Sequence, residues 1–366
     1  MPRSAASRLA APLCIALLAA SPGPAHAQES LANWRIAYGS ENPAMLVLWP
    51  GEALAETPCP IARDAPGAIS TEFFRHSPDG PWRPGMLAAA DMGERLVRTR
   101  LRQPLPWVLV DLQGKARIFT LVEAIAMTGR QRDGEEPPYV FGACRLYATR
   151  PPTDRPEDLR ERGHWPSLGP RRKTWLLHAG PLARTPRVRP VAEPTAYGRD
   201  GAGGLPAPPA PALAVLDLPA VRARLGAEPE AALAALRMAK AQPFEAAVAP
   251  QRGPEPLWNI LWYGQRSERK LSPWVVEILG DSVWGLFRPA NEGAGEGVAP
   301  LHFDVWSGNI TEIPYGARIL AVADLDGNGV DELILENAFW EGRSTDIATW
   351  RDGEFLLAYI GGYEER

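Results

Sequence analysis

One nine-residue segment of this chain has the residue types and the spacing of a cation site. It runs from residue 324 to residue 332 and reads Asp-Leu-Asp-Gly-Asn-Gly-Val-Asp-Glu. Oxygen-bearing side chains occupy its first, third, fifth and ninth positions, and the backbone carbonyl of the seventh would complete the set. Hard oxygen ligands of this kind suit Ca²⁺, which takes roughly six to eight of them. The predicted metal ligands are Asp324, Asp326, Asn328, Val330 and Glu332.

The flanks of this segment exclude an EF-hand. An EF-hand loop begins in the same way, but it needs a bidentate Glu at its twelfth position and a helix on each side. The twelfth position here is Leu335, and the short apolar runs 319–323 and 333–335 predict strands. Gly327 and Gly329 allow a tight turn between those strands. A metal-free turn remains the alternative, because Asp, Asn and Gly favour turns for backbone reasons of their own.

The arrangement of strand, D-x-D-G-N-G-x-x-E-L loop and strand resembles the FG-GAP and VCBS-type repeats of integrin-like β-propellers. The resemblance covers about one blade, residues 317–362, and residues 323–335 carry it. It implies a Ca²⁺ held in a β-hairpin loop that serves structure or adhesion rather than catalysis. Family propellers hold several such loops, usually with Asp where this chain has Asn328 and Glu332, whereas this chain has one full copy. Because Asn328 lowers the charge of the site and leaves three carboxylates, we expect a weak site, with a dissociation constant on the order of 10⁻⁴–10⁻³ M.

Residues 1–27 have the layout of a secretory signal peptide. Arg3 and Arg8 form a basic start, residues 9–20 are apolar, and residues 24–27 resemble a small-residue cleavage site. The apolar stretch is too short to cross a bilayer, and no other segment approaches the roughly 18 apolar residues that a membrane-spanning helix needs. We therefore expect an exported protein, periplasmic or extracellular, that does not span a membrane.

Charge and cysteine content limit the partners of this exported chain. The formal net charge at pH 7 is −4 for the whole sequence and −6 after residues 1–27, which hold two arginines and no acid, are removed, and there is no long basic block, so we expect no nucleic-acid partner. An unidentified protein or glycan partner remains. The two cysteines that follow the signal peptide, Cys59 and Cys144, are expected to form a disulfide in an oxidising compartment, with two buried thiols as the alternative.

The order of composition along the chain predicts a mostly β, antiparallel protein. Residues 28–180 read as a β-rich N-terminal region, 181–215 as a Pro/Gly/Ala-rich linker, 216–248 as a helical connector and 252–366 as a C-terminal β region. The last region should contain a propeller-like blade. Its four strands are expected at 317–324, 332–341, 344–350 and 354–361.

Three local patterns give further expectations. Strong helix formers from Glu230 to Ala241 predict a helix. The turn residues at 280–281 and 307–309 predict two hairpins. The segment Asp111–Lys115 follows an apolar strand and reads as a hairpin turn, with a degenerate copy of the calcium loop as the alternative.

No catalytic signature is present in the sequence. It lacks G-x-S-x-G, H-E-x-x-H, a P-loop and G-x-G-x-x-G, and its histidines have no metal-ligand spacing. The sequence therefore favours a non-enzymatic structural or interaction protein with a calcium-stabilised blade. The alternative is a secreted carbohydrate-active protein, either glycan-binding or a glycoside hydrolase. It rests on thirteen tryptophans, which could stack on sugars but also commonly fill β cores.

Overall fold

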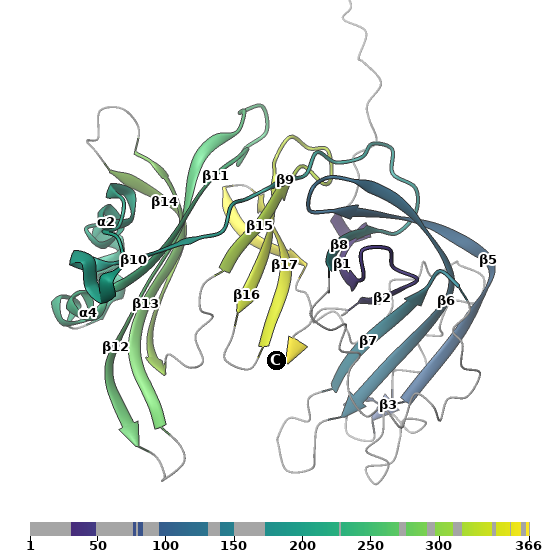
Figure 1. Ribbon diagram of the computed structural model, residues 1–366, viewed down its shortest axis with the longest axis horizontal. Coiled ribbons are helices and arrows are strands. Elements are labelled where there is room, and N and C mark those ends of the chain that lie inside the picture. Colours follow the sequence, from purple (N-terminus) through teal and green to yellow (C-terminus); the bar gives the residue numbers. More distant parts are fainter. Residues whose placement is uncertain are drawn as a thin grey trace, which may run out of the picture.

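The computed structural model describes thirteen stretches of the chain. Within them the chain is mostly strand, in antiparallel sheets with few helices, which confirms the predicted β class. The described strands form a six-stranded barrel, a five-stranded sheet, a six-stranded sheet and a separate two-stranded pair (Figure 1). No propeller is identified among them. The described residues are 31–48, 76–77, 80–82, 95–130, 140–149, 173–226, 228–270, 276–290, 297–309, 317–338, 342–351, 353–359 and 364–365.

The N-terminal region forms a closed six-stranded barrel in the order β1-β2-β7-β6-β5-β8. Its interior is filled by large apolar side chains, among them Trp107, Phe119 and Trp175. Alternate residues of β1, such as Trp34 and Ile36, point outward and pack on the C-terminal sheet. The strands are β1 Trp34–Gly39, β2 Met45–Leu48, β5 Arg95–Asp111, β6 Ala116–Arg130, β7 Val140–Tyr147 and β8 Lys173–His178, with η1 Leu31–Asn33 before β1 and a separate pair β3 His76–Ser77 and β4 Gly80–Trp82.

A five-stranded sheet follows, in the order β10-β11-β12-β13-β14. Short helices cover its outer face (Figure 1), where Val215 and Leu233 pack against Trp262 and Phe287. The strands are β10 Thr195–Gly198, β11 Met238–Ala246, β12 Glu255–Lys270, β13 Val276–Pro289 and β14 Val298–Asn309. The helices are η4 Arg199–Gly204, α2 Ala210–Leu216, α3 Pro219–Arg224 and α4 Pro229–Ala235.

The C-terminal sheet lies between the barrel and the five-stranded sheet (Figure 1). Its order is β18-β17-β16-β15-β9, and β19 pairs with β17 beside this path. Ile334 and Ile347 pack toward the barrel, whereas Leu333 and Leu335 pack toward the five-stranded sheet. Both faces are therefore apolar, and the strands match the four expected from the sequence. They are β15 Ala317–Ala323, β16 Glu332–Ala338, β17 Gly342–Arg351 and β18 Glu354–Tyr359, with β9 Arg189–Pro190 and β19 Glu364–Glu365.

The segment 181–215, expected to be an extended linker, takes part in both open sheets. It contributes β9 and β10, and Val188 is buried in the core between the barrel and the C-terminal sheet. Pro190 is compatible with its place in β9 because β9 is an edge strand, where a missing N–H costs no ladder hydrogen bond.

Two other local predictions were wrong. The helix predicted over 230–241 ends at Ala235, and β11 begins at Met238 and pairs with β12 along its whole length. This pairing overrides the helix propensity of the segment. The hairpins predicted at 280–281 and 307–309 are instead parts of the long strands β13 and β14. Asp281 is tolerated inside its strand because its buried carboxylate pairs with Arg266 Nε at 2.8 Å.

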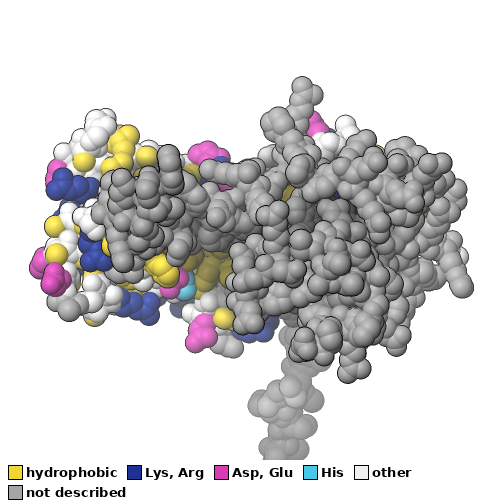
Figure 2. All heavy atoms as spheres, turned by 90° about the horizontal axis from the view of Figure 1, so that it is seen from below, with side chains coloured by type: hydrophobic (Ala, Val, Ile, Leu, Met, Phe, Trp, Pro, Cys, Tyr) yellow, Lys and Arg dark blue, Asp and Glu magenta, His cyan; other side chains and the backbone are white. Residues whose placement is uncertain are grey.

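Other predictions lie outside the described residues. These are the signal peptide at 1–27 and the Cys59–Cys144 bridge, since Cys59 is not described. No helix in the described part of the chain is long and apolar enough to cross a membrane. Seen from below, the described surface around the five-stranded sheet mixes basic and acidic side chains, so neither sign forms a continuous patch there (Figure 2).

Candidate metal centre

The candidate cation loop is the turn between β15 and β16, residues 324–331, together with Glu332 at the start of β16. Ala323 pairs with Glu332 across the two strands, which places the first and last predicted ligands at the base of one hairpin. Gly327 and Gly329 have φ values of 76° and 83°, a left-handed conformation that side chains rarely adopt. The two glycines thus give the chain the sharp reversal that the sequence predicted.

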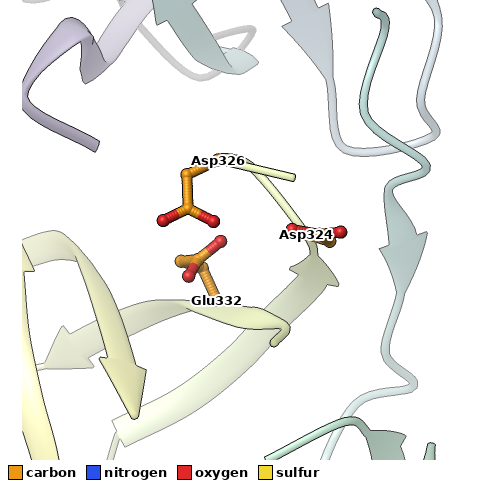
Figure 3. A group of neighbouring side chains, drawn as sticks. All are labelled: Asp324, Asp326 and Glu332. Carbon is orange, nitrogen blue, oxygen red and sulfur yellow. The ribbon is translucent and has the colours of Figure 1, made fainter. Parts of the chain in front are cut away.

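Three of the five predicted ligands lie together. Carboxylate oxygens of Asp324, Asp326 and Glu332 are all within 4.8 Å of one another. Asp326 and Glu332 face each other, and Asp324 lies at the end of β15 (Figure 3). Asp326 is 7% exposed and Glu332 is fully buried. Among the described side chains, this is the one group of three acidic, histidine or cysteine residues close enough to hold a metal ion.

Asn328 closes the loop from within. Its backbone N–H and its side-chain Nδ2 donate to the two carboxylate oxygens of Asp326, at 3.1 and 3.0 Å. Its Oδ1 accepts from the backbone N–H of Val330 at 2.6 Å. The amide therefore stabilises the turn and the orientation of Asp326. The side chain of Val330 is buried against the five-stranded sheet, and the role of its carbonyl as a ligand stays a prediction.

Asp324 retains an acceptor atom that the described residues do not satisfy. Its Oδ2 accepts from the backbone N–H of Gly329 at 3.3 Å and lies 3.5 Å from Arg184. Its Oδ1 is buried and accepts no hydrogen bond within the described part of the chain. Buried carboxylate oxygens are almost always paired, so this atom is a natural position for a bound cation.

Glu332 has a strongly perturbed pKa. Burial is the main cause, and together with the nearby charges of Asp326 and Asp324 it raises the pKa from 4.5 to about 8. Hydrogen bonds donated by Leu325 N, at 2.7 Å, and Thr349 Oγ1, at 2.9 Å, oppose this rise only in part. Without a cation, the loop therefore carries a proton on Glu332 at neutral pH. A divalent cation would have to displace that proton.

Asp331, which is not one of the predicted ligands, holds the loop in place. Its Oδ2 accepts from Arg189 in β9 and from the backbone N–H of Ala247, both at 2.6 Å. Its own N–H donates to the carbonyl of Ala247 at 2.8 Å. Asp331 thus ties the loop to β9 and to the residue that follows β11. No sequence signal marks this role, because Arg189 lies 142 positions away.

The barrel also contacts the loop. The indole nitrogen of Trp34 donates to the carbonyl oxygen of Leu325 at 3.1 Å. The side chain of Leu325 is buried among barrel residues, including Ile36 and Tyr38. The backbone between two predicted ligands is therefore fixed by the barrel as well as by the C-terminal sheet.

The second acidic turn, Asp111–Lys115, is a hairpin turn between β5 and β6. Asp111 Oδ1 accepts from the backbone N–H groups of Gln113 and Lys115, at 3.1 and 2.8 Å, and Oδ2 pairs with Lys173 at 3.2 Å. Burial acts to raise the pKa of Asp111, but the bonds from Lys115 and Lys173 outweigh it and the pKa is lowered. With its acid satisfied by protein donors, this turn is not a second cation site of the same kind.

Neither histidine with a described side chain joins a metal-binding group. His178 is buried beside Trp34, with ring centroids 4.9 Å apart, and His302 lies 3.1 Å from Asp304. His76 and His164 lie where no side chain is described.

The sequence left two roles for the tryptophans, stacking on sugars or filling β cores, and most of the described ones fill cores. Trp258 and Trp284 are partly buried against core clusters, and Trp306 is exposed at 47%. Exposed tryptophans clustered beside paired carboxylates, the arrangement expected for glycan binding, are not present among the described residues. The buried tryptophans are Trp34, Trp107, Trp175, Trp262 and Trp350.

Comparisons with known proteins return no relative. No family model, no curated protein and no solved structure matches this chain. The resemblance of residues 323–335 to FG-GAP and VCBS-type repeats therefore stays an interpretation of the motif.

Proposed function

We propose that the loop between β15 and β16 binds one structural Ca²⁺, and that the protein is an exported, non-enzymatic structural or interaction module stabilised by that ion. The observation that carries this proposal is the group formed by Asp324, Asp326 and Glu332, whose oxygens lie within 4.8 Å of one another. Three ionised carboxylates this close and this buried would repel each other, which is why Glu332 holds a proton without a cation; a divalent cation could take the place of that proton and balance the charges.

The chemistry of the loop favours a hard cation. Every candidate ligand offers oxygen, and the described group contains no histidine or cysteine, which Zn²⁺ prefers. Ca²⁺ accepts backbone carbonyls and irregular geometry, whereas Mg²⁺ demands a near-octahedral set and keeps several waters. A loop with one fixed backbone and mixed carboxylate, amide and carbonyl oxygens suits Ca²⁺ better.

The surroundings of the loop support a structural role. Leu325 and Val330 are buried in two different cores, and Asp331 ties the loop to β9 and Ala247. A loop held in this way has little freedom to move when an ion binds. A calcium sensor needs such a movement, so the loop suits a structural site better. At ten times its dissociation constant, an ion at such a site adds only about 1.4 kcal/mol to the free energy of unfolding.

The exported location rests on the leader-like residues 1–27.

Thermal unfolding with and without Ca²⁺ tests the proposal. The mature protein should unfold at a higher temperature in millimolar Ca²⁺, and the double variant Asp324→Asn/Asp326→Asn should lose this increase. Asp304→Asn, which changes an exposed carboxylate on β14, is the matched control and should respond as the wild type does. An equal increase in all three proteins would show that Ca²⁺ acts elsewhere.

A further inference from the structure

Arg184 lies at the exposed side of the candidate cation loop. Its Nη2 is 3.5 Å from Asp324 Oδ2, and its side chain is 71% exposed. Asp324 is the most exposed of the three clustered carboxylates, at 24% of its side chain, whereas Asp326 and Glu332 are buried. An ion that enters from solvent therefore meets Asp324 first, and it meets the guanidinium of Arg184 at the same place.

The segment that carries Arg184 is anchored on both sides of this residue. It connects β8 of the barrel to β9 of the C-terminal sheet. Before Arg184, the backbone N–H of Ala179 donates to the carbonyl oxygen of Asn33 at 3.1 Å, and Leu182 packs against the core between barrel and sheet. After it, Val188 is buried in the same core. The backbone thus keeps Arg184 beside the loop, while its long exposed side chain is free to change rotamer.

A second arginine at the loop has the opposite character. Arg189 lies 2.6 Å from Asp331, and the two side chains are only 31% and 5% exposed. Asp331 is not a predicted ligand, and it also accepts from the backbone N–H of Ala247, so this pair belongs to the fold. The pair of Arg184 and Asp324 is longer and more exposed, and pairs of that kind are weak. A cation can therefore replace the guanidinium at Asp324 without breaking the loop apart.

We infer, on the basis of the proposed cation site, that Arg184 competes with the ion for the negative charge of Asp324 and so limits the affinity for Ca²⁺. Without an ion, the guanidinium is the counter-charge of Asp324. When Ca²⁺ binds, the ion takes over this role and repels the guanidinium, which moves away into solvent. The strength of binding is then the difference between two cations at one carboxylate. Arg184 is thus a residue that regulates the site without being one of its ligands.

Calorimetric titration of the calcium-free mature protein with Ca²⁺ at low ionic strength tests the competition. Arg184→Gln should bind Ca²⁺ roughly three- to tenfold more tightly than the wild type, because it removes a positive charge from Asp324. Arg184→Glu should bind more tightly still. Arg184→Lys keeps the charge and should stay within about twofold of the wild type. Arg187→Gln removes the same charge from an exposed position further along the segment, and as the matched control it should also stay within about twofold.

Two further measurements separate the charge of Arg184 from a structural role. In calcium-free buffer, Arg184→Gln should unfold at nearly the same denaturant concentration as the wild type, because an exposed ion pair contributes little to stability. Added salt should bring the dissociation constants of the two proteins together, because it screens the exposed guanidinium.

The outcomes distinguish this inference from the cation site on which it depends. Equal dissociation constants for the wild type and Arg184→Gln would overturn the role of Arg184 and leave the cation site standing. An equal gain in Arg184→Gln and Arg187→Gln would also overturn it, because the net charge of the surface would then set the affinity. No heat of binding in any of these proteins would overturn both the site and the competition.

Discussion

The indole nitrogen of Trp34, in the first strand of the barrel, donates a hydrogen bond to the carbonyl oxygen of Leu325 in the candidate cation loop, 291 positions along the chain. This bond joins the barrel to the backbone between Asp324 and Asp326. Because Trp34 is fully buried and Leu325 is nearly so, water does not replace either partner. The geometry of the loop and the packing of the barrel on the C-terminal sheet are thus coupled.

Trp34→Phe should destabilise the protein by roughly 1–3 kcal/mol, because the buried carbonyl of Leu325 loses its donor. The smaller ring also leaves unfilled volume in the core between barrel and sheet. The change in the free energy of unfolding is measured by chemical denaturation. Trp306→Phe, at an exposed position, is the control and should shift stability by less than about 0.5 kcal/mol. Equal effects of the two variants would contradict the assigned role of Trp34.

Asp331→Ala should cost roughly 1–3 kcal/mol of stability, because it removes the acceptor that serves both Arg189 and the backbone N–H of Ala247. Asp217→Ala removes one of the two acidic partners of an exposed arginine, Arg222, and should change stability by less than about 1 kcal/mol. The variant Asp331→Ala should also bind Ca²⁺ more weakly, since the loop is no longer held at β9. Unchanged calcium affinity would show that Asp331 supports the fold without positioning the loop.

The raised pKa of Glu332 gives a dependence of stability on pH. The folded protein keeps the proton on Glu332 up to about pH 8, whereas the unfolded chain releases it near 4.5. Between these values the folded state binds more protons, so without Ca²⁺ stability is full below about pH 4.5 and falls as pH rises through about 8. At roughly 1.4 kcal/mol per pKa unit, the loss is on the order of 5 kcal/mol.

Glu332→Gln should remove most of this pH dependence, because an amide does not titrate. In calcium-free buffer near pH 9, the variant should be more stable than the wild type, although it should no longer gain stability from added Ca²⁺. Denaturation at several pH values with a chelator present measures the effect. Identical pH profiles for the two proteins would contradict the proposed protonation of Glu332.

Asp111 should act in the opposite direction and at lower pH. Its pKa is lowered in the folded protein, so the stability it contributes is present above its ordinary value of 3.8 and is lost as pH falls through the lower folded value. In Asp111→Asn the free energy of unfolding should therefore fall less steeply below about pH 4 than in the wild type. Near neutral pH it should vary with pH as it does in the wild type. An unchanged acid limb would contradict the role of Lys173 and Lys115 at this turn.

Local patterns predicted the parts of the protein that depend on short stretches of chain. The loop 324–332 and its flanking strands follow from residues within a few positions of one another, so the approach of Asp324, Asp326 and Glu332 could be anticipated. The roles of Trp34 and Asp331 could not, because their partners Leu325 and Arg189 are distant in sequence. Only the folded sheets bring them together.

The wrong predictions have the same origin. Residues 238–241 have helix propensity, but β11 pairs with β12 along its whole length, and this pairing outweighs the local preference for a helix. Gly280 and Asp281 form a typical turn pair, yet Arg266 neutralises the aspartate inside β13. The barrel could not be told from other β architectures, because strand patterns reveal the alternation of faces but not which edges meet.

Calorimetric titration of the calcium-free mature protein with Ca²⁺ at several pH values tests the central claim most directly. One ion should bind per chain, with a dissociation constant on the order of 10⁻⁴–10⁻³ M near neutral pH. Binding should tighten as pH rises toward 8, because Glu332 gives up its proton to bind the ion, and the heat should depend on the ionisation enthalpy of the buffer. The absence of heat at millimolar Ca²⁺ at every pH, or binding that persists in Asp324→Asn/Asp326→Asn, would contradict the account.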